Sequence, residues 1–296
     1  MRLSTRCLGL IAGLLTLWAP VRAADHGGPL FDAHLHYNLE AWDGRDGPHP
    51  PEDVLRRLQA AGVRTVLANS RPNEGTHVLA RDAALKAADI RVVPLVRLYR
   101  DRQDYQGWTR DPSILAMVEQ ELARGTAAGP FRGLGEFHLY RAEDALHPVP
   151  QRLVALAEER GLVLMAHCDD AAVELLMAAT PTASRRLRLV WAHTGIEGAS
   201  PARVAELLQR HPGLVGELSY RPGLVCADGQ LCPEWRALLL RFPDRFLIGS
   251  DTWVNGRWDD YAALMQGYRR WLGGLPPEVA QAVAWANGER LFPPGP

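Results

Sequence analysis

Short apolar runs rich in β-branched residues recur along the chain, with amphipathic stretches between most of them. Eight runs have the length and composition of buried strands: Leu30–His36, Val63–Ser70, Val92–Tyr99, Gly133–Leu139, Leu162–Cys168, Leu187–Thr194, Leu214–Tyr220 and Phe246–Thr252. Apolar residues at helical spacing predict helices between them, among others at Pro51–Ala61, Glu74–Ala88, Pro112–Ala127, Gln151–Arg160 and Ala202–Gln209. Several of these helices are followed by a glycine, as at Gly62 and Gly161, where helices commonly end.

This alternation predicts an α/β fold, a single parallel (β/α)8 TIM barrel. A doubly wound open sheet is the main alternative. No Gly-x-Gly-x-x-Gly turn follows a strand, so dinucleotide binding in such a sheet has no support. Asp259–Leu272 and Pro277–Leu291 are expected to be extra C-terminal helices that close the barrel. No repeat or linker marks a second domain, so residues 24–296 are predicted to form one barrel domain.

The first 23 residues have the pattern of a secretory signal peptide. Arg2 and Arg6 precede an apolar segment, Leu8–Ala19, that is too short to span a bilayer. Small residues around Ala23 suit a signal peptidase, so we expect cleavage after Ala23. The mature protein is therefore expected to be periplasmic or secreted.

The charge of the chain limits its partners. Thirty-three basic residues nearly balance 34 acidic ones, giving a net charge of −1, which argues against nucleic acid as a partner. After the predicted signal no apolar run approaches the length of a membrane span, so no membrane partner is expected either. A small-molecule substrate is the remaining expectation.

Cys226 and Cys232 lie six residues apart in a glycine-containing loop. In an exported protein this spacing predicts a local disulfide, with two free thiols as the alternative.

Ionisable side chains gather at the predicted carboxyl ends of the strands, where a barrel of this kind places its chemistry. His34 and His36 alternate along the first strand, so both point to the same face. The others are Glu136, His138, His167, His193 and Asp251. Buried polar groups without partners would each cost roughly 1–3 kcal/mol, so this gathering indicates a shared ligand, and neutral histidines favour a divalent metal.

The pattern resembles the amidohydrolase superfamily of metal-dependent hydrolases over the whole predicted mature chain. That family carries His-x-His on strand one, a carboxylate on strand four, one histidine each on strands five and six, and an aspartate on strand eight. The resemblance implies a set of metal ligands consisting of His34, His36, Glu136, His167, His193 and Asp251. In that set the first two histidines and the aspartate would bind one ion, the other two histidines a second, and the glutamate would bridge.

The bridging residue leaves the branch of the family and the number of ions open. Lys86, the only lysine, lies in a predicted helix, so a carboxylated lysine cannot form the bridge. Glu136 resembles the glutamate of the TatD-like branch, whereas the motifs around His34 and Asp251 resemble the amidohydrolase-2 branch, which often holds one metal. Glu136 could instead pair with Arg97. The expected cofactor is therefore one or two divalent ions, zinc or else manganese or another transition metal.

The implied reaction is hydrolysis by metal-activated water. A divalent metal lowers the pKa of bound water from about 16 to about 7. Asp251 would accept the proton and pass it to the leaving group, and the metals or His193 would polarise the reacting oxygen. An ester, lactone, amide or phosphoester bond would be cleaved. Two alternatives remain: a mononuclear decarboxylase of the amidohydrolase-2 type, and a catalytically silent periplasmic binding protein on the same barrel.

Candidate substrate-binding residues lie at or just beyond the strand ends: Arg71, Tyr99, His138, Arg141, Arg221 and Trp253. Arginines there favour a substrate with an anionic group, which guanidinium can bind through two hydrogen bonds. The alternative for each arginine is a solvated loop charge, and His138 could equally be exposed in the loop that follows its strand.

Overall fold

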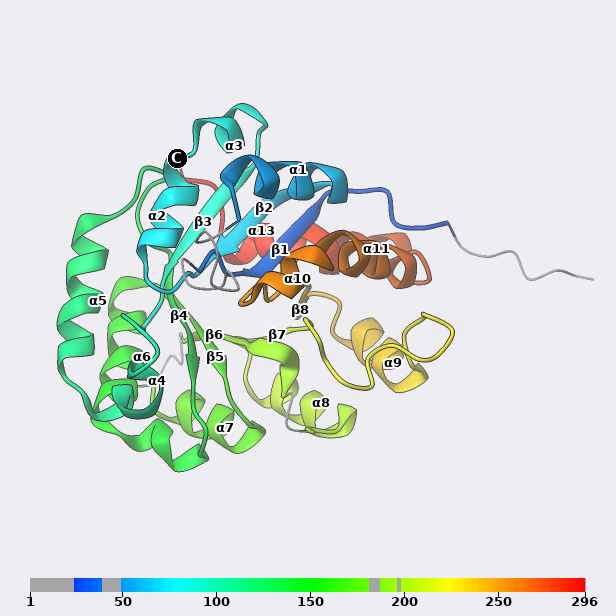
Figure 1. The fold of residues 1–296 in the computed structure, drawn as a ribbon. Helices are drawn as coiled ribbons and strands as arrows, with labels where there is room; N and C mark the ends of the chain where they lie inside the picture. The colour runs from blue at the N-terminus through cyan, green and yellow to red at the C-terminus, as the bar shows by residue number, and fades with distance from the viewer. Residues whose placement is uncertain (1–23, 39–48, 181–186, 196–197, 296) are drawn as a thin grey trace, which may run out of the picture.

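Eight parallel strands, each paired with the next in sequence, form the barrel of this protein (Figure 1). The structure is a computed structural model that describes residues 24–38, 49–180, 187–195 and 198–295. Its strands are β1 (Leu30–Leu35), β2 (Val63–Ala68), β3 (Arg91–Val96), β4 (Gly133–His138), β5 (Val163–His167), β6 (Arg188–Trp191), β7 (Leu214–Glu217) and β8 (Phe246–Leu247). A backbone hydrogen bond of 2.9 Å from Ala33 to Ile248 joins β1 to the chain after β8. The predicted (β/α)8 fold is confirmed.

Helices surround the barrel and follow the strands in turn (Figure 1). They are α1 (Pro51–Ala61), α2 (Glu74–Arg81), α3 (Ala83–Ala87), α4 (Asp104–Gly107), α5 (Ser113–Arg124), α6 (Pro148–Arg160), α7 (Asp170–Ala178), α8 (Pro201–Arg210), α9 (Pro233–Arg241), α10 (Asn255–Asp259), α11 (Tyr261–Leu272), α12 (Pro277–Gln281) and α13 (Asn287–Leu291). The single helix predicted for Glu74–Ala88 is two helices. The chain is extended at Asp82, whose carboxylate caps α3 by accepting hydrogen bonds from two backbone amides.

The barrel interior is filled from its amino-terminal end. Phe292, which follows α13, is fully buried and stacks on Phe31 of β1 with 6.3 Å between ring centroids. Apolar side chains of the other strands complete this inner cluster, including Leu95, Met165 and Val190. The amino-terminal half of the barrel is therefore a packed core, and the carboxyl ends of the strands remain for chemistry.

The strands end earlier than the apolar pattern predicts, and the residues of interest lie on irregular backbone just beyond them. The predicted sixth strand extends to Thr194, but β6 ends at Trp191 because His193 and Thr194 have φ angles of 57° and 45°. Asp251, after β8, also has a positive φ, of 46°. Left-handed backbone at a residue other than glycine is strained, and such strain gathers at functional sites.

The loop after β7 contains a disulfide between Cys226 and Cys232. In the described part of the chain, no helix has the length and apolar character needed to cross a membrane. The predicted signal peptide lies outside the described residues.

Candidate metal centre

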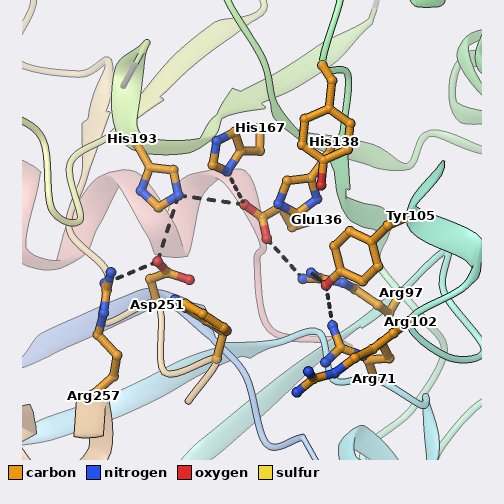
Figure 2. Close-up of a pocket in the computed structure, with 12 residues that line it drawn as sticks. Arg71, Arg97, Arg102, Tyr105, Glu136, His138, His167, His193, Asp251 and Arg257 are labelled. Carbon is orange, nitrogen blue, oxygen red and sulfur yellow. Dashed lines mark hydrogen bonds and ion pairs between the residues drawn. The ribbon is translucent and has the colours of Figure 1, made fainter. Parts of the chain in front are cut away.

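A cavity of about 520 Å³ opens at the carboxyl ends of the strands. Its walls combine acidic and imidazole side chains with four arginines and several aromatic rings (Figure 2). The lining residues are Arg71, Arg97, Arg102, Tyr105, Glu136, His138, Tyr140, His167, His193, Asp251, Trp253 and Arg257. Such a concave, partly apolar site with convergent polar groups is typical of a small-molecule pocket.

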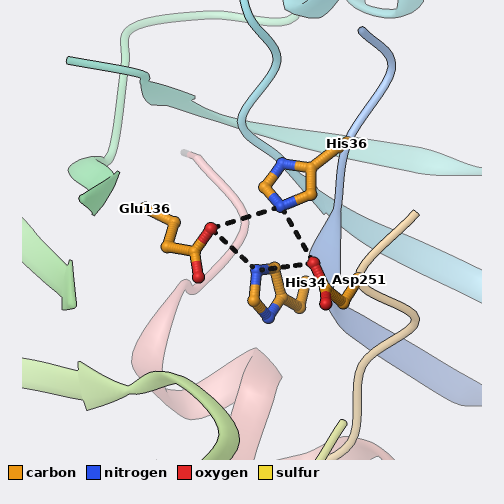
Figure 3. A group of neighbouring side chains, drawn as sticks. All are labelled: His34, His36, Glu136 and Asp251. Atoms are coloured by element: carbon orange, nitrogen blue, oxygen red, sulfur yellow. Dashed lines mark ion pairs between the residues drawn. The ribbon is translucent and has the colours of Figure 1, made fainter. Parts of the chain in front are cut away.

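Four donor atoms, from His34, His36, Glu136 and Asp251, converge on one point beside this cavity (Figure 3). The Nε2 atom of His34 lies 3.5 Å from Glu136 Oε2 and 3.6 Å from Asp251 Oδ1. The Nε2 atom of His36 lies 3.4 and 3.3 Å from the same two oxygens. Four donors around one tetrahedral ion, with bonds of about 2.0–2.2 Å, are separated from one another by about 3.3–3.6 Å. The donor set therefore has the size and the chemistry of a divalent metal site.

An unpaired buried atom supports the same assignment. His34 is fully buried, and its Nε2 has no hydrogen-bond partner among the described residues. Leaving a buried nitrogen unpaired is costly, because the nitrogen has lost its water without a replacement. A metal ion among the four donors would satisfy His34 Nε2.

The histidine rings are oriented by hydrogen bonds on their far sides. The Nδ1 atoms of His34, His36 and His193 contact Glu217 Oε2 at 2.9 Å, the Asn69 carbonyl oxygen at 2.6 Å and the Ser219 carbonyl oxygen at 2.8 Å, respectively. All three partners are acceptors, so each Nδ1 donates its proton and each Nε2 keeps a lone pair toward the site. This arrangement is common for histidines that bind metals.

A second group of donors adjoins the first and shares Glu136. His167 Nδ1 lies 3.2 Å from Glu136 Oε1, and His193 Nε2 lies 3.7 Å from the same oxygen. His193 Nε2 is also 3.8 Å from Asp251 Oδ2. The two oxygens of Glu136 thus face two different halves of the site. Of the six residues of the implied ligand set, Glu136, His167, His193 and Asp251 line the cavity. His34 and His36 are fully buried and contact Glu136 and Asp251.

Electrostatics in the site favour a cation. Burial by itself lowers the pKa of His34, but the nearby carboxylates, Glu136 foremost, raise it well above its usual value. Burial raises the pKa of a carboxyl group, yet His34, His36 and His193 lower the pKa of Asp251 to about 2. The carboxylates therefore stay ionised and favour positive charge among these donors, which a bound metal ion would supply.

Arg97 also contacts Glu136. The ion pair that the sequence suggested as the alternative to a metal bridge is therefore present. The guanidinium of Arg97 is buried, and Nη1 lies 3.0 Å from Glu136 Oε2. Burial alone raises the pKa of Glu136, but His34, His138 and Arg97 together lower it well below its usual value. Glu136 is consequently both a candidate metal ligand and the partner of a permanent cation.

Glu217, at the end of β7, is a functional residue that sequence reasoning missed. It is fully buried and contacts the nitrogen of His34 that faces away from Asp251. It also accepts a hydrogen bond of 3.1 Å from the backbone amide of His193. Glu217 therefore orients two candidate ligands from behind. A single glutamate at the end of an apolar run was the only available signal.

The candidate substrate residues divide into two groups. Arg71, His138 and Trp253 line the cavity. Tyr99 does not: it is buried behind His138, whose backbone amide donates to the Tyr99 hydroxyl at 2.6 Å. The expectation that Tyr99 contacts substrate is corrected to a supporting role.

Two predicted arginines also lie away from the cavity. Arg141 is exposed and pairs with Asp144 at 2.8 Å, because Arg141 directly precedes the short helical segment, Ala142–Leu146, that contains Asp144. Arg221 packs over the Trp235 ring and donates to the Ala199 carbonyl. Both expectations of substrate contact are therefore corrected. Arg102, Tyr105, Tyr140 and Arg257, which the sequence did not single out, line the cavity instead.

A family model and several solved structures match this chain. A family model described as Amidohydrolase matches residues 32–293. No match is found among curated proteins. An amidohydrolase from Burkholderia multivorans, solved with bound zinc, is 20% identical, with a TM-score of 0.56 over 90% of this chain and 100% of that one.

Two further solved structures are similar. A probable 2-pyrone-4,6-dicarboxylic acid hydrolase from Acinetobacter baumannii, with citric acid bound, is 13% identical, with a TM-score of 0.58 over 89% of this chain and 98% of that one. An organophosphorus hydrolase from Deinococcus radiodurans is 18% identical, with a TM-score of 0.57 over 92% of this chain and 97% of that one. At these identities, the likeness establishes a shared fold.

Proposed function

The chain belongs to the amidohydrolase family of metal-dependent hydrolases, and we propose that it hydrolyses an ester, lactone, amide or phosphoester bond in a small anionic substrate. One observation carries the proposal: the Nε2 atoms of three imidazoles, His34, His36 and His193, face two ionised carboxylates, Glu136 and Asp251, that line a cavity with four arginines in its wall. This arrangement joins a metal site to a substrate pocket.

Zinc is the proposed metal. His34, His36 and Asp251 would bind it, with Glu136 beside them. Imidazole nitrogens and carboxylate oxygens in a near-tetrahedral arrangement suit zinc, and a structural neighbour contains that metal. When bound, such an ion makes water nucleophilic near neutral pH and polarises the bond that breaks.

Asp251 is the proposed proton carrier. Its Oδ1 faces His34 and His36, whereas Oδ2 faces His193 and receives a hydrogen bond of 3.2 Å from Arg257. Oδ2 is therefore the oxygen that can take a proton from the attacking water and return it to the leaving group. The pKa of about 2 keeps Asp251 ionised at neutral pH.

His193 is better suited to metal binding than to polarising the substrate. Because its Nδ1 donates to Ser219, its Nε2 carries a lone pair and cannot donate a hydrogen bond to the substrate while the ring is neutral. Its nearest neighbours at Nε2 are the carboxylates of Glu136 and Asp251. Of its two suggested roles, we therefore propose that of a ligand.

An anionic group is proposed for the substrate because of the arginines in the cavity wall. Arg71 and Arg97 both donate to the Tyr105 hydroxyl, and Arg102 lies nearby in the same wall (Figure 2). Arg257 lies in the wall beside Asp251. Guanidinium groups pair well with carboxylate or phosphate, so positive charge here would hold and orient such a substrate.

The test is a panel of matched substrates assayed with zinc-loaded enzyme. Esters, lactones, amides and phosphoesters would each be supplied as a neutral compound and as its carboxylate-bearing analogue. We expect turnover of at least one class, with a higher kcat/KM for the anionic member. Metal-loaded, folded enzyme without turnover on the whole panel would contradict hydrolysis and favour a silent binding protein. Release of carbon dioxide from carboxylated substrates instead would identify a decarboxylase.

Export is part of the proposal. The signal-like pattern of residues 1–23 supports it, as does a disulfide in the loop after β7, because disulfides persist in oxidising compartments. The mass of the protein recovered from the periplasm or medium would test it. An intact amino terminus there would contradict cleavage after Ala23.

A further inference from the structure

We infer that His138 donates, from its Nε2 atom, the hydrogen bond that stabilises negative charge on the substrate oxygen during turnover. This role rests on the proposed function, hydrolysis of a small substrate. His193 is not available for the same task, because its Nε2 carries a lone pair while the ring is neutral.

Tyr99 determines which ring nitrogen of His138 carries the proton. The Tyr99 hydroxyl accepts a hydrogen bond of 2.6 Å from the backbone amide of His138 and lies 3.1 Å from His138 Nδ1. Tyr99 is fully buried, and its hydroxyl has no other hydrogen-bond partner among the described residues. The amide can only donate, so the hydroxyl proton is paired only if it is donated to Nδ1. Nδ1 is therefore an acceptor, and the neutral ring carries its proton on Nε2.

The Nε2 atom of His138 is open to the cavity. His138 lines the cavity, and its Nε2 has no hydrogen-bond partner among the described residues, yet it is not a fully buried atom. The tautomer is the opposite of that in His34, His36 and His193, whose Nδ1 atoms face acceptors and whose Nε2 atoms keep lone pairs. His138 thus presents a donor to the cavity, whereas those three rings present acceptors.

The same tautomer separates His138 from the candidate metal ligands. A ring nitrogen of His138 lies within 4.8 Å of donor atoms of Glu136 and His167, so spacing alone would allow these three residues to share an ion. With Nδ1 bonded to Tyr99 and a proton on Nε2, neither nitrogen of His138 has a lone pair free for a metal. The proximity instead places the N–H group beside the proposed reaction site.

The ring of His138 is held in place before any substrate arrives. It lies between His167 and Tyr105, with ring centroids 4.5 and 5.1 Å away (Figure 2). Trp108 Nε1 donates to the carbonyl oxygen of His138 at 3.1 Å, which fixes the backbone at the end of β4. A donor that is already oriented stabilises developing charge without the cost of reorganisation.

His138 and Asp251 are placed for opposite ends of one step. His138 ends β4 and Asp251 follows β8, so the two lie on opposite sides of the mouth of an eight-stranded barrel. As the oxygen of water bonds to the carbonyl carbon or phosphorus, a proton of the water passes to Asp251, and the electron pair of the double bond moves onto the substrate oxygen. That oxygen accepts the hydrogen bond from His138. When the double bond forms again, the leaving group departs and takes the proton from Asp251.

His138→Phe tests this role, because it keeps a ring in the stack and removes the donor. Zinc-loaded wild type and variant would be compared on the substrate with the highest kcat/KM. We expect kcat to fall by about 10²- to 10³-fold, as when one such donor is lost elsewhere, with KM within about threefold. His138→Gln, whose amide can donate, should restore kcat to within about tenfold of the wild type. His147→Phe is the matched control and should keep its kcat, because it replaces another histidine between β4 and α6, one that bonds to Thr109 at 2.9 Å.

Two measurements do not depend on turnover. In ¹⁵N NMR spectra of metal-free protein labelled at its histidines, the His138 signals, identified by their loss in His138→Gln, should show a proton on Nε2 and none on Nδ1. Tyr99→Phe removes the hydroxyl, so it should let Nδ1 carry the proton in part of the molecules. The zinc affinity of His138→Phe should stay within about threefold of the wild type, because His138 is not a ligand.

Several outcomes would overturn the role of His138. One is a proton on Nδ1 in the wild type, and another is an unchanged tautomer in folded Tyr99→Phe. A large loss of zinc affinity in folded His138→Phe would make His138 a ligand instead. With an active wild type, near-normal kcat in folded His138→Phe would overturn this role alone. A wild type that turns over no substrate would contradict the proposed function together with it.

Discussion

Replacing Glu217 with glutamine should weaken metal binding although Glu217 is placed behind the ligands. Its Oε2 receives hydrogen bonds from His34 Nδ1 at 2.9 Å and from the His193 backbone amide at 3.1 Å, and its Oε1 accepts one of 2.6 Å from the Ser219 backbone amide. All of these groups are donors, so the NH2 group of a glutamine would face a donor whichever way it turned. Losing such a partner costs about 10- to 100-fold in metal affinity. That corresponds to about 1.4–2.7 kcal/mol.

The zinc affinity of metal-free Glu217→Gln would be measured by competition with a chromogenic chelator. Glu121→Gln is the matched control, because Glu121 also accepts from a buried histidine, His77, at 2.8 Å, but on the outer helix α5. Thermal unfolding without metal separates loss of affinity from loss of the fold. The reasoning is refuted if folded Glu217→Gln binds zinc within twofold of the wild type, or if Glu121→Gln weakens binding equally.

Further predictions concern turnover, stability and specificity. Asp251→Asn should keep most of its metal but lose about 10²- to 10⁴-fold in kcat, because the proton carrier is removed; near-normal turnover would refute that role. Zinc at about 1,000 times its Kd should stabilise the fold by about 4 kcal/mol and raise Tm by several degrees over chelator-treated protein, and equal Tm values would argue against a specific site. Arg71→Gln should raise KM for an anionic substrate at least tenfold while leaving its neutral analogue unaffected, and an equal effect on both would exclude a charge contact. Replacing Cys226 and Cys232 with serine should cost about 2 kcal/mol of stability, the entropy of a short closed loop, with little change in kcat; loss of activity in the folded variant would link that loop to the cavity.

The fold was predictable because each strand is buried on both faces and therefore reads as an apolar run. The apolar pattern could not predict where each strand ends and the irregular backbone of the candidate site begins. Ala192, which follows β6, is apolar like the strand, yet His193 beside it adopts left-handed backbone. Apolar periodicity reports burial, and burial continues beyond the last ladder hydrogen bond. Strand ends were accordingly predicted too late, by one residue at β1 (Leu35 instead of His36) and by up to five at β8 (Leu247 instead of Thr252).

The candidate metal ligands could be listed from the sequence because histidines at strand ends are few and the barrel brings strand ends together. Glu217 was not, since its partner His34 lies 183 residues away and a single glutamate carries no spacing motif. The substrate residues were least predictable. Arg141 and Arg71 both follow strands, but one pairs with a neighbouring aspartate and the other reaches the cavity. The direction in which a loop arginine points depends on contacts that no local pattern records.

Glu136 illustrates the remaining limit. From the sequence, a metal bridge and an ion pair with Arg97 were alternatives, because a residue name does not say which oxygen faces which neighbour. In the structure, Oε2 faces Arg97 and the first metal site, while Oε1 faces His167 and His193. Both alternatives therefore compete for one carboxylate within one conformation. It follows that the list of ligands does not determine the number of ions.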